Sequence, residues 1–180
     1  MPRKKTKRKR STTEIVGLAA IVVFVVALVW LVAFTQPQNS VQTTARAPDF
    51  TLTDVDGNPF KLSDQRGKVV VLEFMQTTCP ACTSQEPYLR DLRSKFGADV
   101  VMAIISTNPI GDTDSVLREH RNQNLMGWLA IGDKTEIYKL YGVQSTPTII
   151  IIDKNGYIQY AHVGVTASST LISEVDSLRK

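Results

Sequence analysis

Hydrophobic and polar positions divide the chain into two differently patterned parts. Residues 15–34 are 20 consecutive uncharged and mostly apolar positions. As a helix, this run is about 30 Å long, which matches the hydrocarbon core of a bilayer. A buried helix of a soluble protein is the alternative, but a run that is apolar on every side and follows a basic block argues against it. The pattern therefore predicts a transmembrane helix over residues 14–34.

A cleaved signal peptide is a second alternative for this run. The apolar region of a signal peptide usually spans about 7–15 residues and ends at a small-residue cleavage site. The run here is longer, and the candidate site ending at Ala47 lies far downstream, with Pro48 next. We therefore favour a signal anchor that stays attached to the protein.

From Pro48 onward, short segments of strand and helix character alternate. Alternation of this kind predicts an α/β domain over residues 48–180, with helices on both faces of a sheet. The last two strands are joined by a tight turn at 155–156, so we expect them to be antiparallel and the sheet to be mixed. The expected strands are a hairpin around 56–59 and residues 68–74, 100–106, 127–132, 146–153 and 157–164, and the expected helices are residues 79–96, 112–123, 135–142 and 167–180.

Charge changes the picture at the amino terminus. Residues 1–10 hold seven of the 21 Lys and Arg residues and no acidic residue. Basic residues beside a membrane helix favour the cytoplasmic side, so we predict a cytoplasmic tail over residues 1–13 and an extracytoplasmic domain in a single-pass protein of the cell membrane. A basic tract can also bind nucleic acid, but this one adjoins a membrane span, and we expect no nucleic-acid partner. Residues 35–47 are polar and predict a flexible linker.

Cys79 and Cys82 are the two cysteines of the chain, three residues apart. Zinc in a structural site takes four ligands, and His120 and His162, the two histidines, are far apart in the sequence. A disulfide that closes so small a loop contributes only about 2 kcal/mol of stability. Zinc, copper(I), which soft thiolates bind, and a structural disulfide remain as alternatives to a redox-active pair.

The spacing suits thiol–disulfide exchange for a chemical reason. A strand ending near Gln76 delivers Cys79 to the first turn of the next helix, where unpaired amide groups and the helix dipole stabilise a thiolate. The thiolate is the attacking species. Cys82, one turn later, is close enough to attack a mixed disulfide on Cys79 and release the product. The predicted location outside the membrane is compatible with such exchange.

Several motifs lie in register on this α/β pattern. The domain opens with APDFTLTDVDG and continues through LSDQRGKVVVLEF, which contains Glu73 six residues before Cys79. The CPAC motif is followed by Pro87, and the STPT motif at 145–148 contains Pro147. Together these features resemble the thioredoxin superfamily, specifically the membrane-anchored, extracytoplasmic proteins of the TlpA/ResA type. Their amino-terminal signature is shared with peroxiredoxins.

The resemblance implies a thioredoxin-like fold with one amino-terminal transmembrane helix and a thiol–disulfide oxidoreductase activity. In such a protein Cys79 attacks, Cys82 resolves, and Glu73 moves a proton to or from Cys82. Thr146 and Pro147, a cis-proline in the family, form a platform for a substrate segment. The residues expected to act structurally near the site are Pro80, Ala81 and Pro87.

The resemblance also implies partners. They are protein disulfide or thiol clients, a membrane electron donor and the lipid bilayer, and neither a metal nor an organic cofactor is expected. Pro80 and Ala81 supply neither positive charge nor a side-chain hydrogen bond to a thiolate, and an ionised Glu73 opposes it. We therefore expect a reducing couple, and the family suggests a role such as disulfide reduction before haem attachment.

The sequence also departs from the family pattern. Thr78 stands where Trp usually precedes the first cysteine, and Met75 and Gln76 stand where Trp and a small residue are common. The peroxidase pattern Pro-x-x-x-Thr-x-x-Cys is absent, because Leu72 occupies its proline position and Gln76 occupies its threonine position. This argues against a thiol peroxidase. That activity, a copper-binding protein of related fold, and a docking domain with an incidental disulfide remain the alternative functions.

Other polar and aromatic residues receive simpler interpretations. We expect Glu73 to be buried, with a raised pKa. Trp128 and Tyr141 are expected in the core. His120 is expected to be a solvated helix residue and His162 a residue on a strand surface, neither with a catalytic role.

Overall fold

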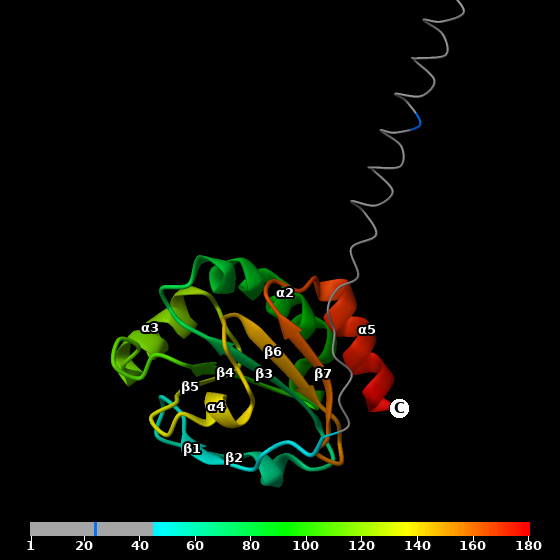
Figure 1. Ribbon diagram of the computed structural model, residues 1–180, viewed down its shortest axis with the longest axis horizontal. Coiled ribbons are helices and arrows are strands. Elements are labelled where there is room, and N and C mark those ends of the chain that lie inside the picture. The colour runs from blue at the N-terminus through cyan, green and yellow to red at the C-terminus, as the bar shows by residue number, and fades with distance from the viewer. Residues whose placement is uncertain (1–23, 25–44) are drawn as a thin grey trace, which may run out of the picture. The chain divides into compact units, whose positions relative to one another are not determined.

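The computed structural model describes Phe24 and residues 45–180. The elements of this part of the chain are β1 (Thr51–Thr53), β2 (Pro59–Lys61), η1 (Leu62–Gln65), β3 (Val69–Met75), α2 (Pro80–Phe96), η2 (Gly97–Asp99), β4 (Val100–Ser106), α3 (Asp114–Gln123), β5 (Leu129–Gly132), α4 (Ile137–Leu140), β6 (Thr148–Ile152), β7 (Ile158–Val163) and α5 (Ser168–Arg179). A five-stranded sheet has the order β5-β4-β3-β6-β7, and β1 and β2 form a separate hairpin (Figure 1).

The central strand is β3, whose seven residues are all buried. Continuous burial is what the apolar sequence VVVLEFM predicts for a strand covered on both faces. β3 pairs in parallel with β4 and antiparallel with β6. β4 pairs in parallel with β5, and β6 pairs antiparallel with β7. The expected mixed sheet is confirmed.

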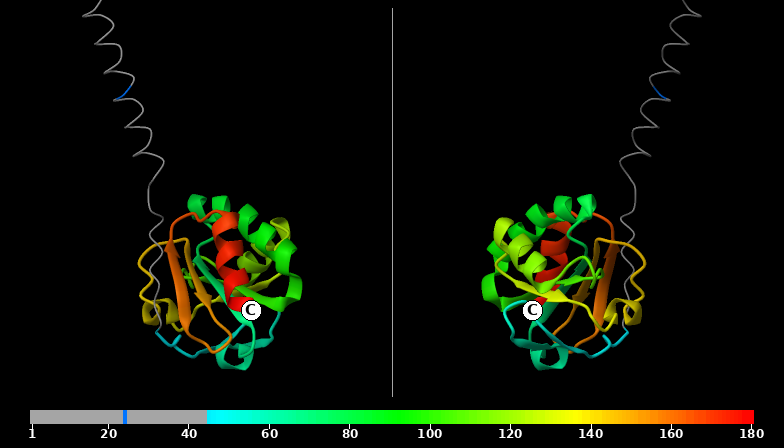
Figure 2. Two further views of the ribbon diagram at one scale, coloured as in Figure 1. Left: turned by 90° about the vertical axis from the view of Figure 1, so that its right-hand side faces the viewer. Right: turned by 90° about the vertical axis from the view of Figure 1, so that its left-hand side faces the viewer.

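The two faces of the sheet carry different covers. Side chains alternate along β3, so Val71, Glu73 and Met75 share one face while Leu72 and Phe74 share the other. Apolar residues of α2, α3 and α5 pack with the first face. Residues of the β1–β2 hairpin and α4 pack with the second (Figure 2). Helices therefore lie on both faces, but α4 is only four residues long and the hairpin supplies much of the second cover.

Helix α2 begins where the sequence predicts. Cys79 is its N-cap and Pro80 its first residue, a position where the missing N–H of proline leaves no hydrogen bond unmade. The helix ends at Phe96 and is followed by Gly97 at a φ of 55°, in the left-handed range that glycine adopts without strain. Pro87 lies inside the helix. The start of α2 thus follows the carboxyl end of β3 by a short loop.

The amino-terminal predictions fall mostly outside the described residues. The predicted tail over 1–13 and most of the linker lie there, as does the predicted membrane helix over 14–34 apart from Phe24. Within Phe24 and residues 45–180, no helix has the length and apolar character needed to cross a membrane. Residues 45–47, expected in the linker, bond to the turn before β7: Ala47 N–H donates to the Gly156 carbonyl at 3.0 Å, and Ile158 N–H donates to the Ala45 carbonyl at 2.8 Å.

Candidate active site

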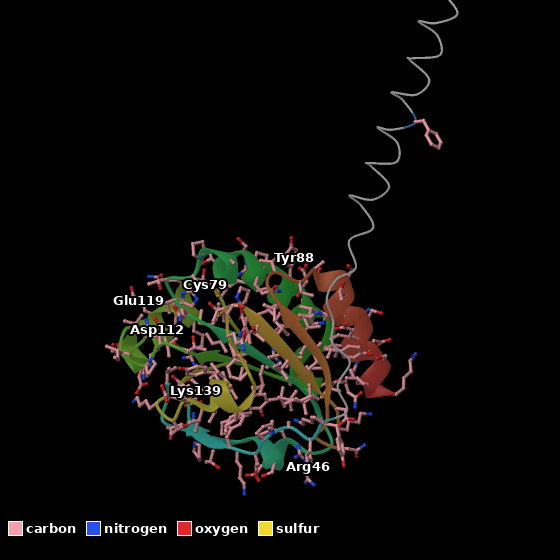
Figure 3. The ribbon with its side chains drawn as sticks, viewed as in Figure 1. Arg46, Cys79, Tyr88, Asp112, Glu119 and Lys139 are labelled. Carbon is pink, nitrogen blue, oxygen red and sulfur yellow. A yellow bond between two sulfur atoms is a disulfide. The ribbon has the colours of Figure 1, made fainter. Side chains whose placement is uncertain are left out.

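The two cysteines lie at the amino-terminal end of α2. They form a disulfide whose Cα atoms are 5.3 Å apart. The sulfur of Cys79 accepts a hydrogen bond from the Cys82 backbone N–H at 3.1 Å, so this side chain caps the helix. Cys79 is partly exposed, whereas Cys82 is 1% exposed. The position predicted for Cys79, at the start of α2, is confirmed (Figure 3). Because only Cys79 is partly exposed, an incoming group can reach its side chain but not that of Cys82.

A buried carboxylate holds the loop that precedes Cys79. Asp112, in the loop before α3, accepts hydrogen bonds from the backbone N–H of Thr77 at 3.1 Å and from the Thr77 hydroxyl. Its other donor is the Ser106 hydroxyl, at 2.5 Å, at the end of β4. Asp112 is not the N-cap of α3, which is Thr113. Asp112 therefore fixes the approach to the dithiol, a role that sequence reasoning missed.

The STPT loop lies against the exposed sulfur. The Thr146–Pro147 peptide bond is cis, as predicted. The carbonyl oxygen of Thr146 lies 3.6 Å from the sulfur of Cys79. The Pro147 carbonyl accepts a hydrogen bond from the Gly164 N–H at 2.8 Å, which ties the loop to the end of β7. The structure therefore brings Cys79, Thr146 and Pro147 together.

Glu73 is buried beneath this site, 2% exposed. Neither carboxyl oxygen has a hydrogen-bond partner among the described residues. Burial, and secondly the negative charge of Glu86, raise the pKa of Glu73 from 4.5 to about 8. The expected burial and raised pKa are confirmed. At neutral pH this carboxyl group holds a proton that it can give or take back.

Three further residues of α2 shape the site. The side-chain amide of Gln85 is fully buried: its Nε2 donates to the Thr166 carbonyl at 3.0 Å, and its Oε1 accepts from the Thr166 N–H at 2.6 Å. These two bonds fasten α2 to the loop before α5. Pro80 and Ala81 are exposed. Substrate approaching the disulfide therefore meets two small uncharged side chains.

A polar cavity of about 190 Å³ opens beside the dithiol. It lies between the loop after β3 and the STPT loop. The Gln76 amide donates to the Thr107 hydroxyl at 3.1 Å across one wall. A larger cavity of about 470 Å³ lies at the start of β4, the opposite end of that strand from the dithiol. The residues lining the smaller cavity are Gln76, Thr107, Tyr138, Val143, Gln144, Ser145 and Thr146.

The interpretation of both histidines is wrong. His162 is 3% exposed, and its Nε2 lies 2.7 Å from Glu174 Oε2 on α5. The His120 side chain is 12% exposed, and its Nε2 lies 2.9 Å from Glu86 Oε1. Each histidine is drawn inward because a carboxylate on a neighbouring helix offers it a partner. Trp128 is 6% exposed and Tyr141 packs at the edge of the core, as expected.

The described residues also bear on the question of metal ligands. Among Phe24 and residues 45–180, no cluster of three or more His, Cys, Asp and Glu side chains is arranged to hold a metal ion. The cysteine sulfurs are joined to each other. The chemistry available at this end of the sheet is therefore that of a disulfide beside a buried, protonated carboxyl group.

Comparison with known proteins identifies relatives of this chain. Residues 43–161 match the model of the AhpC/TSA family. Thiol-disulfide oxidoreductase ResA of Geobacillus kaustophilus is 30% identical over 81% of this chain and 83% of its own length. Thioredoxin-like protein YneN of Bacillus subtilis is 26% identical over 79% of this chain and 84% of its own.

Solved structures agree with these sequence relatives. The crystal structure of a putative thiol:disulfide interchange protein DsbE from Chlorobium tepidum superposes with a TM-score of 0.69 at 26% identity, covering 78% of this chain and 99% of that one. The fold is therefore thioredoxin-like, as the sequence predicts. The disulfide lies at the start of a helix, and the relatives in sequence and structure are named as thiol–disulfide oxidoreductases or interchange proteins. The chain therefore belongs to the AhpC/TSA family and is a thiol–disulfide oxidoreductase of the ResA/DsbE type.

Proposed function

We propose that the protein is a membrane-anchored, extracytoplasmic oxidoreductase that reduces disulfides in client proteins. The observation that carries the proposal is the Cys79–Cys82 disulfide at the start of α2, with Cys79 facing the carbonyl of Thr146 beside cis-Pro147. The sequence relatives named as thiol-disulfide oxidoreductases support the reaction class.

The reaction begins with the reduced dithiol. The Cys79 thiolate attacks a client disulfide, forms a mixed disulfide and expels one client thiolate. In molecules whose Glu73 is ionised, a fraction that grows as the pH rises towards 8, Cys82 gives its proton to that carboxylate and attacks Cys79, which releases the second client thiolate. Two electrons pass to the client, both client thiolates take up protons, and the Cys79–Cys82 disulfide forms. A dithiol donor at the membrane returns two electrons and two protons.

The roles of the two cysteines follow from exposure and hydrogen bonding. Cys79 is partly exposed, and its sulfur accepts the Cys82 N–H, an arrangement that favours a thiolate. Cys82 is buried and can act only after Cys79 has captured the client. Near neutral pH, Cys79 should therefore be alkylated first. Faster alkylation of Cys82 in the reduced protein would reverse the assignment.

Thr146 and Pro147 offer a backbone edge on which an extended client segment can pair. The neighbouring cavity is lined by hydroxyl and amide side chains. Gln76 is one of them, and its replacement by Leu should change the preference among client peptides without changing the reactivity of Cys79 towards a small alkylating reagent.

The direction of electron flow follows from what surrounds Cys79. The Thr146 carbonyl oxygen points towards the sulfur, and its partial negative charge disfavours a thiolate. Pro80 and Ala81 bring neither positive charge nor a side-chain donor. A less favoured thiolate makes a more reducing couple, so we expect a potential near about −270 mV and not near about −120 mV.

A redox titration of the full chain in detergent against glutathione tests this direction. Alkylation of free thiols followed by a gel shift reports the reduced fraction. A midpoint above roughly −160 mV would make the protein an oxidant of clients and contradict the reductase proposal.

Membrane attachment rests on the apolar run over 15–34 and the seven basic residues before it. Protease added to spheroplasts or intact cells should remove the domain and leave a membrane-bound stub, while a cytoplasmic marker survives. Protection of both would place the domain in the cytoplasm.

The activity test is reduction of insulin by the full chain in detergent, with dithiothreitol as donor. Neither a metal nor an organic cofactor enters the scheme, so treatment with a chelator should leave the rate unchanged. Cys79→Ser should abolish turnover, and Cys82→Ser should accumulate mixed disulfides that identify the clients. One-to-one binding of copper(I) without insulin reduction would instead favour a copper-binding function.

A further inference from the structure

A buried acid of α2 lies in the same layer as the dithiol. Glu86 follows Cys82 by four residues, so the two side chains lie on one face of α2, a turn apart. Glu86 is 2% exposed. Val71 and Met75, which flank Glu73 on its face of β3, belong to the same core cluster as Cys82. Cys82, Glu73 and Glu86 therefore share the space between β3 and α2.

His120 reaches this space from α3. Its Nε2 lies 2.9 Å from Glu86 Oε1, close enough for an ion pair, although the two groups are not aligned for a hydrogen bond. On the other side of the ring, the Asn124 amide nitrogen lies 3.4 Å from Nδ1. An amide donor at Nδ1 leaves Nε2, the ring nitrogen nearer Glu86, to carry the ring proton. The edge of the imidazole that carries this proton thus lies against a buried carboxyl group.

The other charged groups around Glu73 have partners of their own. Its neighbours in register within the sheet are Ile104 on β4 and Ile149 on β6, both apolar. Beyond Ile149 the same row ends at His162 on β7, which pairs with Glu174 of α5 at 2.7 Å. Two arginines of α2 also have partners. Arg90 lies 3.9 Å from Glu86 Oε2 and donates to the Asn124 carbonyl, and Arg93 donates to the carbonyls of Gly97 and Val100.

Two carboxyl groups in one poorly solvated space hold a proton between them unless a donor or cation stabilises a charge. The imidazole faces Glu86, whereas the oxygens of Glu73 have no hydrogen-bond partner among the described residues. A negative charge is therefore better stabilised at the position of Glu86 than at that of Glu73. The negative charge of Glu86 in turn raises the pKa of Glu73 and is the second largest cause of that rise, after burial.

We propose that His120 is a positioning residue for the exchange reaction: by facing Glu86 it keeps that carboxyl group ionised, so that the shared proton resides on Glu73, in the layer of Cys82. This inference rests on the proposed function for the use of that proton. The placement of the proton itself can be measured on the oxidised protein without any client.

The test follows the carboxyl carbons of 13C-labelled glutamate by NMR in the full chain in detergent, oxidised, between pH 5 and 10. Glu73→Gln and Glu86→Gln assign the two signals. In the wild type, the Glu73 signal should titrate with a midpoint at a pH of about 8. Glu86→Gln removes the neighbouring charge and should lower this midpoint by about one unit.

His120→Leu should shift the midpoint in the same direction. Without the imidazole, a negative charge on Glu86 is less well stabilised and raises the pKa of Glu73 less, so the Glu73 midpoint should fall by up to about one unit. The double variant with Glu86→Gln should match Glu86→Gln alone, because His120 acts through Glu86. His120→Lys, which restores a positive donor, should return the midpoint towards the wild-type value.

His162→Leu is the matched control, since it removes a buried, paired histidine from the same face. It should leave the Glu73 midpoint in place. A Glu73 midpoint unchanged by His120→Leu overturns the proposal. If His120→Leu folds poorly, His120→Lys decides, and a Glu73 midpoint in His120→Lys as low as that of Glu86→Gln overturns the proposal. Loss of insulin reduction with intact shifts would contradict the proposed function and not this inference.

Discussion

Glu73 and Phe74 are neighbours on β3, and they face opposite environments. Phe74 points into an apolar layer where its ring packs against Tyr141, with centroids 5.3 Å apart. The polar atom that Tyr141 brings there is satisfied, because its hydroxyl donates to the Pro48 carbonyl at 2.8 Å. Glu73 points into the layer under α2, where its oxygens have no hydrogen-bond partner among the described residues.

The difference shows how one sheet serves two purposes. The layer of Phe74 follows the rule that buried polar groups are paired, and it contributes stability. The layer of Glu73 departs from that rule, because the buried carboxyl group beside the dithiol has no hydrogen-bond partner among the described residues. Unpaired buried carboxyl groups are destabilising when ionised, and they persist where their proton is used in chemistry. The predictions below separate the two layers.

Phe74→Ala should have the largest effect on stability. Removing a fully buried ring leaves a cavity, and the free energy of unfolding should fall by about 3–5 kcal/mol. The redox potential of the dithiol should change little, since the ring faces away from it. Urea denaturation and the glutathione titration measure the two quantities, and Phe74→Leu serves as the milder control. A large change in potential would show that the two layers are not independent.

Glu73 should make stability depend on pH. Its pKa is about 8 in the folded state and 4.5 in its ordinary state, so the folded protein binds the proton more tightly. The free energy of unfolding should therefore be highest below pH 4.5, fall as the pH rises towards 8 and then level off. The fall should be on the order of 5 kcal/mol, because the pKa rises by about 3.5 and each pKa unit corresponds to about 1.4 kcal/mol. In Glu73→Gln this fall should be missing from curves of stability against pH, and equal slopes in both proteins would refute the assignment.

The same substitution should slow the exchange reaction. Glu73→Gln keeps the shape of the side chain but cannot accept a proton from Cys82. Release of the mixed disulfide should be slower by about tenfold or more. Stopped-flow measurement of the resolving step gives the rate, and alkylation of Cys79 by a small reagent is the control that should stay close to the wild type. An unchanged resolving rate would leave Glu73 without a role in exchange.

Tyr141→Phe should have the smallest effect. It removes one hydrogen bond, to Pro48, from the apolar layer and leaves the ring contacts in place. The free energy of unfolding should fall by about 1 kcal/mol, with insulin reduction unchanged. A clear loss of insulin reduction in a variant that is still fully folded would show that this face of the sheet also serves the exchange reaction.

Local signals predicted the parts of the site that are close in sequence. The strand, the short loop and the helix start placed Cys79, and the apolar neighbours of Glu73 predicted its burial. The loop with cis-Pro147 came from the family resemblance. These elements depend on hydrogen bonds and alternation within a few residues, which a single sequence displays directly.

The missed residues depend on contacts between distant elements. His120 lies three residues after Leu117, the buried residue of α3, so helical spacing placed it near the core-facing side. The acid that draws it inward, Glu86, is on another helix, and the spacing of the sequence does not reveal that contact. On β7, apolar residues occupy both alternating sets, so the pattern could not tell which face holds His162.

Asp112 has a consequence for the order in which the protein assembles. It lies 35 residues after Thr77, whose loop it fixes. A nascent chain that has left the ribosome only as far as Ser106 exposes both cysteines, β3 and β4, yet its cysteine loop is still unanchored. The contact with Thr77 cannot form until Asp112 has also left the exit tunnel. We expect Cys82 to react readily with thiol reagents in ribosome-bound chains that have emerged no further than Ser106, and to become protected in longer chains once α3 has emerged and packed.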